Sequence, residues 1–251
     1  MNEKYKITLA YDGTHYSGWQ IQPNSPTIQE ELHKSLKLLL REKIIVIGAG
    51  RTDSGVHAKA QVAHFSYSKD IDTLQLMKSL NGILPRDVRI LKVEHICKTF
   101  HARYSAKRKI YHYFLNLNPF QDPFRRLYSH HVRHKLDIDA MKTAAKYFIG
   151  THDFTSFANE AHSGSAGRNP LRTLYRLDLV EENNGYIRLE FEGESFLYKM
   201  VRNIVGTLLD VGSKKISAND ITAIFQAKDR RCAGRASPAL GLFLISIDYP
   251  T

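Results

Sequence analysis

The chain has 251 residues, of which 43% are hydrophobic and 24% are charged, a balance that excludes an intrinsically disordered chain. No stretch is apolar for long enough to cross a bilayer, and the N-terminal residues lack a signal-peptide core, so we expect a cytoplasmic protein. The formal net charge of +11 favours a polyanionic partner such as nucleic acid, although a basic surface that only keeps the protein soluble would carry the same charge.

The first hundred residues predict the element order β-α-β-β-α-β. Apolar and polar side chains alternate over residues 5–11, which is the period of a half-buried strand. Thr27 and Glu30 form a capping box in front of an apolar helical stripe that ends at Leu40. The other elements of this half are expected at residues 44–49 (strand), 58–67 (strand), 72–84 (helix) and 88–93 (strand).

The remaining sequence repeats this order with longer connections. Asn184 and Gly185 lie between two alternating runs, which predicts a β-hairpin with a tight turn. The other elements are expected at residues 109–117 (strand), 141–149 (helix), 195–212 (helix) and 243–249 (strand). Two split β-α-β units in tandem indicate an α+β protein with two ferredoxin-like halves, residues 1–105 and 106–251, fused around a mixed, largely antiparallel sheet. A central cleft between such halves is where we expect a ligand.

One segment, residues 159–170, shows no periodicity and is small, polar and rich in glycine. These features predict a loop. Arg168 and Arg172 flank its end, so the loop could close over a phosphate backbone; a passive surface loop would have the same composition.

The densest polar segment is GRTDSGVHA at residues 50–58, between two predicted strands. Its glycines tolerate positive φ and close backbone approach, so a ligand could come near Asp53. The Arg51 guanidinium would keep the Asp53 carboxylate ionised when a bound base excludes water. An ionised, partly dehydrated carboxylate can act as a nucleophile. The spacing alone also allows a purely structural Arg–Asp pair in a tight turn.

This segment resembles the GRTDAGVHA signature of the tRNA pseudouridine synthase A family, with Ser54 in place of alanine. Further blocks resemble that family in the same order: YDGTHYSGWQ (11–20), TIQEEL (27–32), RKIYHYF (108–114), GTHDFTSF (150–157) and SFLYKMVRNIVGTLLDVG (195–212). The closing SPALGLFLISIDY is similar to the family's AP-x-x-GL-x-L end but has Ser237 before Pro238. The resemblance covers nearly the whole chain.

The resemblance implies the pseudouridine synthase fold and a role for particular residues. Asp53 would be the catalytic aspartate, Arg51 its ion-pair partner, and Tyr111 the ring that packs against the target uracil. A uridine in an RNA stem must be flipped out before it can react, and a flipped base needs a ring to stack on. Without the resemblance, Tyr111 would be an ordinary strand tyrosine that fills the core.

Arg202 and Leu242 complete the implied substrate-binding set. On the helix predicted at residues 195–212, Arg202 shares a stripe with Lys199, Gly206 and Asp210. This stripe could face the cleft and bring Arg202 to Asp53 or to a phosphate, or it could be a solvated helix face. Leu242, in the closing block, would form the apolar edge of the pocket.

The implied activity is the isomerisation of uridine to pseudouridine at positions 38, 39 and 40 in the anticodon stem-loop of tRNA, by a homodimer without a cofactor. Asp53 would attack C1′ of the ribose or C6 of the uracil. No metal is expected, because the histidines at 130, 131 and 134 lack carboxylates at ligand spacing, and Cys97 and Cys232 show no zinc or disulfide pattern.

Two other classes of function compete with this one. The first is a non-catalytic RNA-binding module or tRNA chaperone, because basic ferredoxin-like folds often bind RNA without altering it. The joint presence of Asp53, Arg51 and Tyr111 argues against it. The second is a hydrolase or nuclease with Asp53 as a base or metal ligand, which the shortage of further paired carboxylates makes less favourable.

Overall fold

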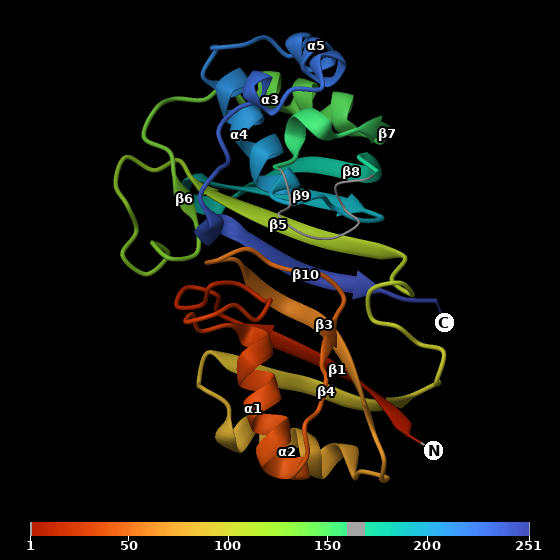
Figure 1. The fold of residues 1–251 in the computed structure, drawn as a ribbon. Helices are drawn as coiled ribbons and strands as arrows, with labels where there is room; N and C mark the ends of the chain where they lie inside the picture. The colour runs from red at the N-terminus through yellow and green to blue at the C-terminus, as the bar shows by residue number, and fades with distance from the viewer. Residues whose placement is uncertain (1, 160–168, 251) are drawn as a thin grey trace. The chain divides into compact units, whose positions relative to one another are not determined.

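The computed structural model describes residues 2–159 and 169–250 (Figure 1). The chain forms two compact units: the N-terminal unit comprises Met1–Lys107 together with Phe243–Thr251, and the central unit comprises Arg108–Leu242. The C-terminal residues thus return to the first unit, whereas the division predicted at residues 105 and 106 kept them with the second half. Residues 160–168 of the predicted loop lie outside the described residues.

The N-terminal unit follows the predicted β-α-β-β-α-β order. Its elements are β1 (Glu3–Tyr11), α1 (Ile28–Leu40), β2 (Ile47–Gly48), β3 (His57–Tyr67), α2 (Thr73–Ile83) and β4 (Val88–Ile96), joined by β10 (Leu242–Asp248) from the end of the chain. The strand order is β4-β1-β3-β10, and β2 pairs with β3. These pairs are antiparallel except for β10 with β3, where Phe243 lies opposite His57.

Both helices of this unit begin at side-chain caps, as the capping box predicted for the first. Thr27 Oγ1 accepts a hydrogen bond from the Glu30 N–H (3.4 Å), and Asp72 Oδ1 accepts one from the Gln75 N–H (2.9 Å). Such caps satisfy amide groups that the first helical turn leaves unpaired. The fully buried apolar residues of β1 and α1 are Tyr5, Ile7, Leu9, Ile28, Leu32 and Leu36.

The strand predicted at residues 44–49 is wrong in length, because only Ile47–Gly48 pair with β3. Side chains of α1 bind the backbone just before this pair. Gln29 Nε2 donates to Val46 O (2.8 Å), and the Val46 N–H donates to His33 Nε2 (3.1 Å). These bonds occupy the backbone groups that a longer strand would have paired.

The central unit has the sheet order β5-β9-β8-β7 with antiparallel neighbours. Its elements are β5 (Arg108–Asn116), β6 (His130–His131), α3 (Ile138–Ala145), β7 (Gly150–Asp153), β8 (Leu171–Glu182), β9 (Tyr186–Gly193), α4 (Met200–Gly212) and α5 (Asp220–Ala227). Two-residue β6 pairs with β5 in parallel. The predicted hairpin is confirmed, with Asn184 (φ 63°) and Gly185 (φ 73°) in the left-handed conformation that its tight turn requires. An α+β protein with mixed, largely antiparallel strand pairing is therefore confirmed.

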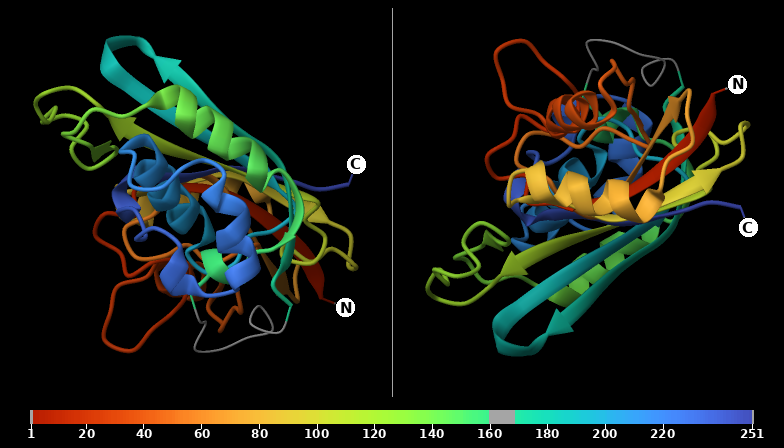
Figure 2. Two further views of the ribbon diagram at one scale, coloured as in Figure 1. Left: turned by 90° about the horizontal axis from the view of Figure 1, so that it is seen from above. Right: turned by 90° about the horizontal axis from the view of Figure 1, so that it is seen from below.

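Helices α3 and α4 pack against each other on one face of this sheet (Figures 1 and 2). The second of them begins at Met200 rather than at Ser195 as predicted, because Lys199 adopts φ 58° and interrupts a helical path. Helix α5 had no counterpart in the predicted elements. In the described part of the chain, no helix is both long and apolar enough to cross a membrane.

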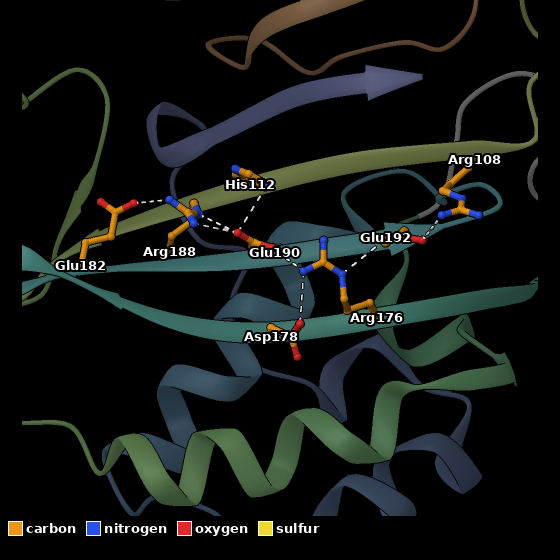
Figure 3. Close-up of polar contacts among 8 residues, drawn as sticks. All are labelled: Arg108, His112, Arg176, Asp178, Glu182, Arg188, Glu190 and Glu192. Atoms are coloured by element: carbon orange, nitrogen blue, oxygen red, sulfur yellow. Dashed lines mark hydrogen bonds and ion pairs between the residues drawn. The ribbon is translucent and has the colours of Figure 1, made fainter. Parts of the chain in front are cut away.

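The opposite face of the central sheet carries a ladder of alternating charges (Figure 3). This charged ladder consists of Arg108, His112, Arg176, Asp178, Glu182, Arg188, Glu190 and Glu192. Arg176 donates hydrogen bonds to Glu190 and to Glu192 (3.3 Å), and Arg188 reaches Glu190 from the other side (2.8 Å). Burial alone would raise the pKa of Glu190, but the hydrogen bonds from Arg176 and Arg188 outweigh it and hold this pKa below its ordinary value.

Candidate active site

The segment that contains Asp53 is a tight turn between β2 and β3. The Val56 N–H donates to Asp53 O (3.1 Å), and Gly55 has a positive φ of 76°, which closes the turn. Within it Arg51 is exposed, Thr52 is buried and Asp53 is half-buried. The turn therefore leaves the Asp53 carboxylate partly open to a ligand while its neighbour Thr52 anchors the backbone.

A second segment, residues 11–20, interlocks with this turn. The Trp19 N–H donates to Thr52 O (3.1 Å), and the Gly55 N–H donates to Tyr16 O (3.2 Å). Gly18 has φ +93°, and a Cβ placed there would lie 2.4 Å from Thr52 O. Two backbones that approach this closely exclude any side chain, so glycine fixes the position of the turn.

Buried polar side chains of β1 and β3 form hydrogen bonds to the turn. The Tyr11 hydroxyl is 2.8 Å from Thr52 Oγ1 and accepts a hydrogen bond from Gln61 Nε2 (3.4 Å). Gln61 Nε2 also donates to Gly50 O (3.1 Å). Burial raises the pKa of Tyr11 to about 12, so its hydroxyl stays protonated and keeps its hydrogen bonds at neutral pH. The residues on both sides of Arg51 are therefore fixed.

The start of β3 anchors the other end of the turn. His57 is buried, and its Nδ1 accepts a hydrogen bond from the Gly13 N–H (3.1 Å). Its ring stacks on Phe243 of β10, with ring centroids 4.5 Å apart and an interplanar angle of 21°. A Cβ at Gly13 would lie 2.0 Å from Val56 O, so this contact also requires glycine. The Asp53 turn is thus held by residues from both ends of the chain.

The other predicted substrate-binding residues belong to the central unit. Tyr111 lies on β5, is 8% exposed, and meets the Phe196 ring edge-on with centroids 5.0 Å apart. Arg202 lies on α4, and its Nε donates to Ser237 O (2.7 Å). Leu242 is buried and is the first residue of β10. Asp53 and Arg51 therefore share one turn, Tyr111 and Arg202 come from β5 and α4 of the central unit, and Leu242 lies where that unit ends and β10 begins.

Comparisons with known proteins identify the family. The model of the tRNA pseudouridine synthase family matches residues 7–105 and 144–250. The chain belongs to the tRNA pseudouridine synthase family. A relative in Protochlamydia amoebophila, named tRNA pseudouridine synthase A 1, is 59% identical over 98% of this chain and 96% of its own length. A protein named tRNA pseudouridine synthase A in a Thermoanaerobacter species is 46% identical over 97% of this chain and 98% of its own length. A protein of the same name in Chlamydia muridarum is 45% identical over 100% of this chain and 94% of its own length.

The family match covers most of the predicted site. Residues 7–105 contain the Asp53 turn together with the segment that interlocks with it, and residues 144–250 contain Arg202 and Leu242. Tyr111 lies between the two matched ranges. Its assignment therefore depends on the resemblance of residues 108–114 to a family block.

The departure of this chain from the family signature, Ser54, is accommodated without strain. Its side chain is exposed, and the Ser54 Oγ donates to Tyr16 O (3.2 Å). The hydroxyl thus adds one hydrogen bond to the interlock between the two segments.

The helix face predicted from Lys199, Arg202, Gly206 and Asp210 is not a solvated face: Gly206 is buried and the other three residues are half-buried. Lys199 precedes the helix, and a Cβ at Gly206 would lie 1.7 Å from Arg235 O. The Ser237 N–H also donates to Arg202 O (3.0 Å). Gly206 does permit a close approach, but the approaching backbone belongs to this chain, to residues 234–237. Residues 234–237 therefore pack against this face of α4, a contact between segments that the periodicity of the helix could not predict.

The clustered histidines take part in local structure. His130 and His131 form β6, and His131 Nε2 lies 2.8 Å from Asn118 O. Within residues 2–159 and 169–250, no three His, Cys, Asp or Glu side chains form a group that could hold a metal ion.

The residues that the sequence left unassigned are mainly those that position the turn. They are Tyr11, Gly13, Gly18, Gln61 and Phe243. Gly13 and Gly18 stand within the YDGTHYSGWQ block. Two glycines in so short a block indicate close backbone contacts, so the sequence did contain a signal for their role. The contacts of Gln61 and Phe243 depend on strand pairing and gave no signal in the sequence.

Proposed function

We propose that Asp53 is the nucleophile with which this member of the tRNA pseudouridine synthase family converts uridine in tRNA to pseudouridine. The supporting observation is that Asp53 is half-buried in a turn fixed by backbone hydrogen bonds from residues 16–19, by the side chains of Tyr11 and Gln61, and by His57, which stacks on Phe243. A preorganised nucleophile loses little freedom when it reacts, which lowers the barrier.

The reaction requires no partner beyond the RNA. Asp53 attacks C1′ of the ribose or C6 of the uracil, and the bond between N1 and C1′ breaks. The uracil rotates, C5 forms a bond to C1′, and the proton on C5 leaves while N1 gains one. After attack at C1′, the ester bond between Asp53 and C1′ breaks as C5 bonds to C1′; after attack at C6, the bond between Asp53 and C6 breaks once C5 has joined C1′. On either path the carboxylate is regenerated and no cofactor is consumed.

The remaining substrate-binding assignments are part of the same proposal. Tyr111 packs its ring against the flipped uracil, Arg51 and Arg202 supply positive charge near the reacting nucleotide, and Leu242 forms the apolar edge of the pocket. A flipped base needs stacking partners in place of its neighbours, and tyrosine supplies one. That these residues meet in one central cleft stays a prediction.

The finer statements about substrate and assembly depend on the family resemblance. We propose the anticodon stem-loop as the target, at tRNA positions 38, 39 and 40, and a homodimer as the active form. The expected cytoplasmic location also stays a prediction. The net charge of +11 supports a polyanionic substrate without selecting among RNAs.

One assay separates this proposal from its rivals. Unmodified tRNA labelled with tritium at uridine C5 is incubated with the protein, and tritium release and RNA chain length are followed. Release without cleavage is expected. Cleavage would indicate a nuclease, and binding with neither event would indicate an RNA-binding module or chaperone.

Asp53→Asn keeps the shape of the side chain and removes its charge. We expect tRNA binding to persist and tritium release to fall by several orders of magnitude. Asp139→Asn, at an exposed aspartate in the first turn of α3, is the matched control and should keep full activity. An Asp53→Asn protein that releases tritium as fast as the wild type would overturn the assignment.

A further inference from the structure

The loop between β5 and β6, residues 117–129, extends from the end of β5 (Figures 1 and 2) and carries two exposed phenylalanines. Phe120 is 84% exposed and Phe124 is 88% exposed. Exposed phenyl rings contribute nothing to the core, and a pair of them on one loop is typical of an interaction site. The loop lies within residues 106–143, between the ranges that the family model matches.

The sequence of the loop repeats one pattern. Asn118-Pro119-Phe120 is followed after one residue by Asp122-Pro123-Phe124, so each phenylalanine follows a proline and an Asn or Asp. Proline fixes φ of its own residue, and Asn and Asp side chains bind nearby backbone groups in turns. The pattern therefore presents two rings on two stiffened turns.

The first turn is fixed by hydrogen bonds to the end of the sheet. Asn116, which is fully buried, accepts through Oδ1 from the Asn118 N–H (2.9 Å) and from Asn118 Nδ2 (2.8 Å). Asn118 Nδ2 also donates to Asn184 O (2.8 Å), in the turn between β8 and β9. The backbone that leads to Phe120 is thus tied to two strands.

The second turn is fixed by Asp122. Its Oδ1 accepts from the Phe124 N–H (2.8 Å), and its Oδ2 accepts from the Tyr186 hydroxyl (3.0 Å). The Arg125 guanidinium lies over the Tyr186 ring, 4.3 Å from its centroid. This contact orients the guanidinium of Arg125, which follows Phe124 in the chain and stays exposed.

Phe120, Phe124 and Arg125 line a shallow depression of about 510 Å³, together with Tyr186, Asn183 and Asn184 from the neighbouring turn and strand. Arg125 and Arg126 are exposed next to it. Flat apolar rings beside arginines are the combination with which proteins hold unpaired bases and their phosphates, because every base has a face that can stack and every nucleotide carries a negative charge.

We propose that residues 117–129 form a second RNA-binding site, in which Phe120 and Phe124 stack on unpaired bases of the substrate and Arg125 and Arg126 bind adjacent phosphates. This site rests on the proposed function, because the RNA that it holds is the tRNA on which Asp53 acts. It adds affinity and orientation and takes no part in bond breaking.

The test compares replacements that separate ring stacking from apolar contact. In Asp53→Asn protein, which holds tRNA without turning it over, Phe120→Ala with Phe124→Ala should weaken tRNA binding at least about tenfold, since stacking of a base on an aromatic ring is worth several-fold to a hundredfold in affinity. Replacement of both by leucine should weaken it similarly, whereas replacement of both by tryptophan should preserve it.

Salt dependence distinguishes the two parts of the site. The phenylalanine replacements should shift affinity equally at every salt concentration. Arg125→Ala with Arg126→Ala should reduce the slope of log affinity against log salt by about 1.4 to 1.8, the value for two lost phosphate contacts. Leu38→Ala, at a leucine of α1 that is 67% exposed, is the control and should change neither quantity.

The outcomes separate this site from the proposed function. If the wild type releases tritium from tRNA but both phenylalanine-to-alanine replacements bind tRNA as tightly as the parent, the second site is refuted and the function stands. If the double leucine variant binds tRNA as tightly as the parent, stacking on the two rings is refuted. If the wild type neither binds nor modifies tRNA, both proposals fall.

Discussion

Gly18→Ala tests whether the interlock of two segments positions Asp53, the proposed nucleophile. At Gly18 an added Cβ would lie 2.4 Å from Thr52 O and 3.0 Å from the carbonyl carbon of Asp53, whereas ordinary contacts begin at 3.4 Å. The turn must therefore move by about 1 Å, and a displacement of that size at a reacting group costs roughly 100-fold in rate. The positive φ of this residue adds about 1–2 kcal/mol of strain.

The assay is tritium release under kcat/KM conditions, together with urea unfolding to show that the variant is folded at the assay temperature. Gly82→Ala is the matched control. Gly82 lies in α2 with nothing within 4 Å of an added Cβ, so alanine should stabilise the helix by roughly 0.5–1 kcal/mol and leave activity unchanged. A folded Gly18→Ala protein with wild-type kcat/KM would show that the interlock does not position Asp53.

Three further predictions concern the supports of the turn and the charged ladder. Tyr11→Phe removes the hydroxyl that contacts Thr52 and Gln61 and leaves buried polar groups unsatisfied, so urea unfolding should show a loss of about 1–3 kcal/mol and tritium release should slow. Ser54→Ala removes one exposed hydrogen bond, so stability should change by less than about 1 kcal/mol and kcat/KM by less than twofold; a larger loss would mean that the hydroxyl contacts substrate. Glu190 has a lowered pKa in the folded protein, so the stability that it contributes is present above its unfolded pKa of about 4.3 and is lost as pH falls through its folded pKa. Glu190→Gln should therefore lower the unfolding free energy at pH 7 by about 1–2 kcal/mol and flatten its decline between pH 5 and pH 3; equal pH dependence in both proteins would refute the role of the ladder.

Local signals predicted the elements that local chemistry determines. The capping box at Thr27 located the start of α1, and Asn184 with Gly185 located the hairpin turn between β8 and β9. Both depend on residues a few positions apart in the sequence. The motif at residues 50–58 likewise located the turn that carries Asp53, because Gly55 adopts the positive φ that closes the turn.

Contacts between distant segments explain what the sequence did not predict. The strand expected at residues 44–49 is short because Gln29 and His33, on the preceding helix, bind Val46. The helix face at Gly206 is covered because residues 234–237 return to it. The periodicity of a segment does not show which distant residues will pack against it. Both differences depend on such long-range contacts.

The pairing of β10 with β3 has a consequence for the order in which the protein matures. Phe243 is synthesised after all the other residues that support the Asp53 turn. A nascent chain can therefore fold most of its N-terminal unit before the Phe243 ring is available to stack on His57. A prematurely terminated polypeptide would carry the whole GRTDSGVHA motif and yet lack the aromatic partner beneath it. The final packing of the turn that carries Asp53 thereby depends on synthesis of the chain as far as Phe243.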